Sequence, residues 1–354
     1  MFRYLGFASL SFLLVACVTS PRVAQGVNVT EVARIASDRF FDKALILDNN
    51  TVIAAAFDGV YLYSTSGKLL QTIPNQSIVQ YMAVNKAQNR VFVSDYEKSI
   101  VWDIATGNQI LAFQHEDNNR NAAAAEDFSL FYADGRLWRS LQGGLQSTRV
   151  NDDPSTRSSA VSPDDRWLLT GSLEGPALLW DIVKNKASYR WNTKMPVLSS
   201  FFSPDSGYAF LLYKGKTANT TIAAYKVASG ERVAELKHSS SVNTWAFDRR
   251  TTNLWVGTEN GVVQQWQYPD FKKMSTFKID SPVLASTAFE QYVLTGQDNG
   301  TLNLIDTENG QSHALTPLNG SVRGLSVNNN KYLLVNMKEA GKNVSTLVIL
   351  QISK

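Results

Sequence analysis

The residues that most often carry out chemistry are few in this chain and lie far apart. His115, His238 and His313 stand in three separate stretches, and none has a second histidine or a carboxylate at the spacing of a metal site or a catalytic triad. Cys17 is the only cysteine, so the chain has no cysteine pair for a disulfide or a structural zinc site. These residues predict no metal and no cofactor.

Other candidates for catalysis have simpler structural interpretations. Asp164, Asp205 and Asp298 stand in sequences typical of turns, where an aspartate commonly accepts hydrogen bonds from nearby backbone amides. Residues 214–217 read Lys-Gly-Lys-Thr, but Phe210 occupies the position of the upstream glycine of a phosphate-binding loop. Because no catalytic set of residues can be assembled, we expect that the protein is not an enzyme.

The composition indicates a folded protein that does not bind nucleic acid. Hydrophobic residues make up 44% of the 354 residues and charged residues 18%, which excludes a highly charged disordered chain. The formal net charge is only +3, and like charges do not occur in long runs. A basic surface of the kind that binds nucleic acid is therefore not expected.

The N-terminal residues predict export. Residues 1–16 combine one basic residue, Arg3, with an apolar stretch that is shorter than the ~20 residues needed to span a bilayer, a pattern typical of a signal peptide. Residues 14–17, Leu-Val-Ala-Cys, resemble the lipobox of bacterial lipoproteins.

The lipobox resemblance implies that Cys17 is lipidated and becomes the mature N-terminus. Acyl chains on this residue would hold the protein on a membrane permanently. Val18 and Thr19 replace the aspartate that resembles an inner-membrane retention signal, so we expect the outer membrane, facing the periplasm. Residues 17–28 would then form a lipidated tether, and residues 29–354 the folded domain.

A repeat of about 40 residues fills the rest of the chain. Each unit holds a short apolar segment followed by a turn, as in residues 99–107, Ser-Ile-Val-Trp-Asp-Ile-Ala-Thr-Gly. The anchor residues of the eight units are Tyr63, Trp102, Trp138, Trp180, Tyr225, Trp266, Ile305 and, approximately, Leu350. Between the anchors, β-rich runs alternate with Gly, Asn, Asp and Pro, which predicts four short strands per unit.

These features resemble the WD-repeat family of β-propellers. Residues 102–103 and 180–181 are Trp-Asp pairs, and residues 162–164 and 203–205 begin the Ser-Pro-Asp-Gly turn of that family. The resemblance implies an all-β fold: a single propeller of eight blades, in which the anchors pack between blades and His238 forms a hydrogen bond within its own blade. If the faint third unit, about 119–150, were an insertion, the count would fall to seven.

The last unit ends after its third strand, and an N-terminal segment could complete it. Val29 to Ala36 forms an apolar-polar stretch ahead of the first unit that has no partner of its own. We expect this stretch to pair as the outer strand of the last blade and to close the ring, because an open ring would leave strand edges unpaired.

The resemblance also implies a binding face. Propellers of this family present binding residues where the first strands begin and in the turns between the second and third strands. When the units are aligned on residues 242–244, the equivalent positions hold basic, apolar and amide side chains. This mixture suits contact with a protein. The candidate residues are Arg157, Leu198, Asn243, Leu284 and Arg323, with Glu259 and Gln297 in the turns.

The sequence therefore favours a membrane-anchored scaffold for other proteins of the bacterial cell envelope. Two alternatives remain. The propeller lipoprotein of the outer-membrane barrel-assembly machine is similar in its anchor and its number of units, although its family places a tryptophan where this chain has Gln71 and Leu111. A periplasmic hydrolase or quinone-dependent dehydrogenase would instead need ionisable groups around the central channel.

Overall fold

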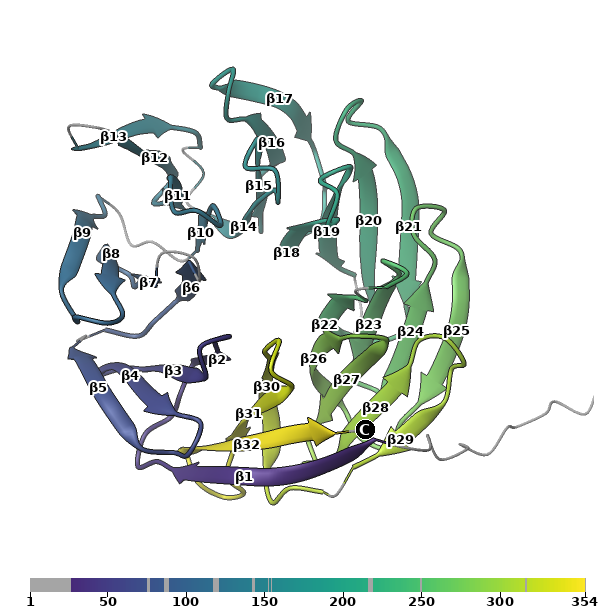
Figure 1. Ribbon diagram of the computed structural model, residues 1–354. Coiled ribbons are helices and arrows are strands. Elements are labelled where there is room, and N and C mark those ends of the chain that lie inside the picture. The colour runs from purple at the N-terminus through teal and green to yellow at the C-terminus, as the bar shows by residue number, and fades with distance from the viewer. Residues whose placement is uncertain are drawn as a thin grey trace, which may run out of the picture.

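The eight predicted units form eight blades of a ring. The computed structural model describes residues 27–354 apart from 75–76, 86–88, 117–120, 142–143, 152, 154, 216–218, 249, 316 and 354. This part of the chain contains thirty-two β-strands and no α-helix, and the strands form eight four-stranded antiparallel sheets around a common centre (Figure 1). The protein is an eight-bladed β-propeller, as the repeat predicts.

In each of the first seven blades the strands run in chain order from the centre of the ring outwards. Blades 1 to 3 contain β2 (Lys43–Ile46), β3 (Thr51–Ala56), β4 (Gly59–Ser64), β5 (Leu69–Pro74); β6 (Tyr81–Asn85), β7 (Arg90–Ser94), β8 (Lys98–Asp103), β9 (Gln109–Gln114); and β10 (Ala122–Ala124), β11 (Leu130–Ala133), β12 (Arg136–Leu141), β13 (Gly144–Arg149). Blades 4 and 5 contain β14 (Thr156–Val161), β15 (Trp167–Ser172), β16 (Ala177–Asp181), β17 (Lys186–Trp191); and β18 (Val197–Phe202), β19 (Tyr208–Lys214), β20 (Thr220–Lys226), β21 (Arg232–His238). Blades 6 and 7 contain β22 (Val242–Phe247), β23 (Leu254–Thr258), β24 (Val262–Trp266), β25 (Lys273–Lys278); and β26 (Val283–Phe289), β27 (Tyr292–Gln297), β28 (Leu302–Asp306), β29 (Ser312–Ala314). The faint third unit is thus a complete sheet, and the seven-bladed alternative is wrong.

Blade 8 joins the two ends of the chain. It consists of β30 (Ser321–Val327), β31 (Tyr332–Lys338), β32 (Ser345–Ser353) and, as its outer strand, β1 (Asn28–Ala36) (Figure 1). Asn28 pairs with Ser353 and Ala36 with Thr346. The expected closure is confirmed, although the folded part begins slightly earlier than residue 29, because Val27 is already buried between blades 7 and 8. Residues 1–26, with the predicted signal peptide and Cys17, lie outside the described residues.

The antiparallel sheets give the ring two different faces. We call the face at which all first strands begin the upper face; the turns between second and third strands also lie there. The opposite, lower face carries the turns between first and second strands and between third and fourth strands. In blade 8 the start of β30 and the end of β1 lie at the upper face, so Asn28 lies at the lower face.

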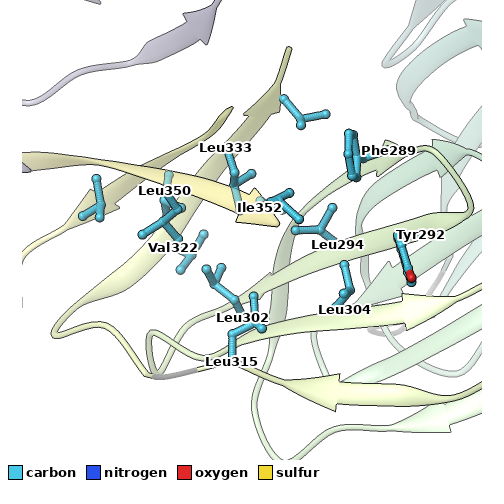
Figure 2. Packing of buried hydrophobic residues seen from close by; sticks show 14 of the residues in the cluster. Phe289, Tyr292, Leu294, Leu302, Leu304, Leu315, Val322, Leu333, Leu350 and Ile352 are labelled. Carbon is cyan, nitrogen blue, oxygen red and sulfur yellow. The ribbon is translucent and has the colours of Figure 1, made fainter. Parts of the chain in front are cut away.

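Apolar side chains fill the space between every two neighbouring blades. Eight separate clusters occupy the eight junctions, and each contains one anchor of the repeat. Figure 2 shows the junction of blades 7 and 8, where Leu294, Leu302 and Leu304 face Val322 and Leu350. Because a single blade cannot bury both faces by itself, each anchor stabilises two blades at once. The predicted packing of the anchors is confirmed.

Hydrogen bonds of the serine and aspartate side chains hold the two Ser-Pro-Asp turns that the sequence predicts. In the turn after β14, Trp167 donates its backbone N–H to Ser162 Oγ (2.9 Å), and Ser162 donates its hydroxyl to Asp164 (2.5 Å). The corresponding bonds at Ser203 measure 2.9 and 2.6 Å. Asp165 and Ser206, which replace the family's glycine, adopt positive φ angles of 56° and 60°.

The outer strand of one blade also contacts a turn of the next. With its side-chain amide oriented so that both atoms have a partner, Gln71 of β5 donates to the carbonyl of Ile104 (3.1 Å) and accepts from the N–H of Gly107 (3.0 Å), both in blade 2. In blade 4, Trp191 donates its indole N–H to the carbonyl of Gly230 in blade 5 (2.9 Å). Gln71 therefore links two blades at the position where the barrel-assembly family has tryptophan.

Side-chain hydrogen bonds of Asn328 and Asn330 join blade 8 to blade 1, and we call these bonds the polar latch. Asn328 is buried and donates its side-chain amide to the carbonyl of Leu47 (2.8 Å). The exposed Asn330 donates to the carbonyl of Asp48 (2.7 Å) and to Asn50 (2.9 Å). These bonds hold together elements that are about 280 residues apart in the chain.

Candidate interaction face

The five candidate residues at the strand starts occupy structurally equivalent positions. In each case the first strand has a β-bulge at its second or third residue, and the candidate is the extra residue without a partner in the neighbouring strand. Such bulges bend the strand and redirect the side chain. The bulged residues are Arg157, Leu198, Asn243, Leu284 and Arg323. The structure thus places all five on the upper face, around the central opening.

Asn243 shows how a bulged residue is held. Its side-chain amide donates to Glu259 Oε2 (2.8 Å) in the adjacent turn and to the carbonyl of Val283 (3.1 Å) in blade 7. Asn243 is half-buried and Glu259 is exposed. The predicted pair is therefore brought together, and it links blades 6 and 7 at the upper face.

The prediction for the second turn residue, Gln297, is wrong, because Gln297 does not lie in the exposed turn between β27 and β28. It is fully buried at the end of β27, where it donates to Thr295 Oγ1 (2.9 Å) and accepts from Asn303 (3.1 Å). The exposed equivalent of Glu259 is the next residue, Asp298, which accepts a hydrogen bond from Ser321 (2.6 Å) and lies 3.6 Å from the guanidinium of Arg323. An alignment on the turn glycines Gly261 and Gly300 would have found it.

The remaining candidates differ in exposure. Leu198 is 41% exposed, an unusual state for a large apolar residue on an inner strand, whereas Leu284 and Arg157 are half-buried. Arg157 Nη1 is inaccessible to solvent and has no hydrogen-bond partner. The upper face therefore offers an apolar side chain and a guanidinium close to the central opening.

The first strands carry few charged groups. Within their described residues only Lys43, Arg157 and Arg323 are charged, all three are cationic, and each lies near the upper end of its strand. Small residues are frequent elsewhere, and the hydroxyls of Thr244 and Ser286 meet at 2.7 Å across neighbouring first strands. The carboxylates of Glu259 and Asp298 lie in the adjacent upper-face turns, beside Asn243 and Arg323.

His238 differs from the expectation. Its side chain is only 4% exposed, but neither ring nitrogen has a hydrogen-bond partner, so the bond within blade 5 that the resemblance implied is not formed. The ring instead stands edge-on against Trp266 of blade 6, with 6.0 Å between the centroids. Burial lowers the pKa of His238 to about 4, and the positive charge of Lys273 adds to this shift.

Two further features bear on function. In the described part of the chain, no three His, Cys, Asp or Glu side chains gather closely enough to hold a metal ion. Within the same residues, no helix is long and apolar enough to span a bilayer.

Comparisons with known proteins support the fold. No protein-family model matches the chain. The structure is similar to the crystal structure of the computationally designed Ika8 protein, with a TM-score of 0.73 and 18% sequence identity, covering 90% of this chain and 98% of that one. At this identity the similarity concerns the fold alone.

Proposed function

We propose that the protein is a lipid-anchored β-propeller of the WD-repeat type that binds other proteins of the bacterial cell envelope through its upper face. The WD-type anchors and turns, the lipobox and the leader support this proposal, and the outer membrane is the expected location. The protein acts by contact, without turnover of a substrate and without a cofactor.

The equivalent bulges of the five first strands are the observation that carries the proposal. In blades 4 to 8 one bulged residue per blade lies at the upper end of the first strand. Leu198 and Arg323 are exposed, and the other three are half-buried. Arginine is enriched at protein interfaces, and an exposed apolar side chain such as that of Leu198 is removed from water when a partner binds.

The test is crosslinking and affinity capture from intact membranes. We compare the native chain with a Leu198→Glu/Arg323→Glu variant, which removes one exposed apolar group and one cation from the upper face. The matched control is Lys226→Glu/Ala228→Glu, two exposed residues at the turn between β20 and β21 on the lower face. Loss of the same partners in the first variant but not in the control is the expected result.

Recovery of identical partners with both variants would refute the upper face as the binding site. Capture of proteins of the barrel-assembly machine through this face would favour the narrower function of an outer-membrane assembly factor.

The anchor is tested separately. Cys17→Ser removes the residue that would carry the acyl chains, so the variant should lose stable association with membranes in flotation assays. Unchanged flotation would remove lipidation from the proposal.

A further inference from the structure

A second set of β-bulges exposes apolar side chains on the outer strands. In six blades the outer strand contains one extra residue opposite its third strand, and five of these residues are large and apolar, 39 to 54% exposed. The five are Val32, Leu70, Ile110, Val233 and Met274; the sixth, in blade 4, is Ser188. Each of the five precedes a buried or half-buried apolar residue by three positions, as Leu70 precedes Ile73.

Four of these five residues lie near the lower face of the ring, whereas Val32 lies midway along β1. The outer strands of blades 1, 2, 5 and 6 begin at the lower face, and the bulge is at their second residue. In blade 4, where the bulged residue is a serine, Val183 in the lower turn is 79% exposed instead.

Exposed apolar groups are therefore distributed unevenly. Ten large apolar residues of the described chain are exposed, and seven of them lie on the lower turns or on the outer strands, whereas Phe57, Ile78 and Leu198 lie at the upper face. We call the seven the lower rim: Val32, Leu69, Leu70, Ile110, Val183, Val233 and Met274. Single exposed apolar residues are ordinary on protein surfaces, but their concentration near one side of the ring is what a surface that meets a partner or a membrane requires.

The position at which β1 begins indicates that the lower rim contacts the membrane. The chain enters the fold at Asn28, which lies at the lower face beside Ser353. Only ten residue steps separate Cys17 from Val27, which can span at most about 35 Å and on average about 17 Å. To lay the upper face on the membrane, this segment would also have to span the length of β1, about 30 Å for nine residues.

We infer that the protein rests on the membrane with its lower rim, whose apolar side chains contact the interface of the bilayer, while the upper face points away into the aqueous compartment. This inference rests on the proposed lipid anchor. Basic residues such as Lys68, Lys184 and Lys272 flank the rim, but acidic residues such as Asp164 and Asp165 lie in neighbouring lower turns. The apolar side chains of the lower rim, and not a net charge, therefore make the contact with the bilayer. We expect this contact to be insensitive to salt. The partner of the upper face is accordingly a water-soluble segment.

Fluorescent labels on single cysteines test the orientation. The full-length lipidated protein is placed in vesicles of phosphatidylethanolamine and phosphatidylglycerol that contain a lipid quencher. Labels are attached at Val183→Cys or Met274→Cys in the lower rim and at Phe57→Cys at the upper face, since acylated Cys17 has no free thiol. We expect quenching at the two lower positions to exceed that at the upper position several-fold, at low and high salt.

Two further variants separate the rim from the anchor. Val32→Asp/Val233→Asp should at least halve the quenching of the label at position 183, while Phe57→Asp/Ile78→Asp, at the upper face, leaves it unchanged. Equal quenching of both faces, or stronger quenching at position 57, would overturn the inference while the anchor stands. Failure of the lipidated protein to float with vesicles would overturn the proposed anchor itself.

Discussion

At the scale of single residues, His238 links stability to pH. The folded protein keeps this buried ring neutral down to its pKa of about 4, whereas an unfolded histidine takes up a proton near pH 6.5. As the pH falls from 6.5 to about 4, the unfolded state binds a proton that the folded state does not bind. This group therefore lowers the free energy of unfolding by up to about 3 kcal/mol.

His238→Phe should remove this contribution. Urea denaturation at pH 7 and pH 4.5 should show a smaller loss of stability for the variant than for the native chain. An equal loss in both proteins would contradict the assignment of a neutral, buried imidazole.

Gly230 combines a positive φ angle with a close neighbour, as turn glycines such as Gly135 and Gly261 also do. Its φ angle is +68°, and an added Cβ would overlap the ring of Tyr189 from blade 4. Gly341 has a similar φ of +73° but open space around it. Gly230→Ala should therefore destabilise the protein by about 1–3 kcal/mol more than Gly341→Ala, because only the former adds an overlap to backbone strain. Similar melting temperatures for the two variants would contradict this account.

At the same scale, the predictions for Gln297 and His238 differ from the structure. Gln297 is one position away from the exposed turn residue, because β27 continues to Gln297 and Asp298 precedes Gly300 by two positions, as Glu259 precedes Gly261. The bond expected of His238 came from a resemblance, and its actual neighbour, Trp266, belongs to another blade. The outer bulges were missed because a bulge depends on the register between two strands, which one strand's sequence does not contain.

At the scale of elements, the sequence predicted the strands well because the alternation of apolar residues and the turn residues agree in most units. The closing strand β1 was found from the missing fourth strand of the last unit, a topological argument that needs no propensity. The five strand-start candidates occupy equivalent positions because the units could be aligned on residues 242–244, and equivalent residues in repeats take equivalent positions. The bulges at these positions were not predicted.

Closing strand β1 can be tested with two neighbouring residues of opposite exposure. Ile35 is buried between blades 8 and 1, so Ile35→Ala should cost about 2–4 kcal/mol. Val32, on the same strand, is exposed, so Val32→Ala should cost less than about 1 kcal/mol. Urea midpoints of the two variants provide the measurement, and equal costs would contradict the pairing described for β1.

At the scale of the whole molecule, the ring depends on the junction of blades 8 and 1. Asn328→Ala removes a buried donor and leaves the carbonyl of Leu47 without it, which should cost about 1–3 kcal/mol. Asn330→Ala removes exposed bonds at the same latch and should cost less. Thermal unfolding compares them, and a greater loss for Asn330→Ala would argue against the buried bond as the main polar contact of the latch.

The pairing of β1 with β32 also sets the order of events during synthesis. The first strand to leave the ribosome is the one whose partner is made last, so residues 28–36 remain without a partner until almost the whole chain has been translated. During that time seven blades can form and stack in sequence, but the circle stays open. Completion of the native structure is consequently a single late step, and a chain that stops short of β32 leaves its own beginning exposed to association with other chains.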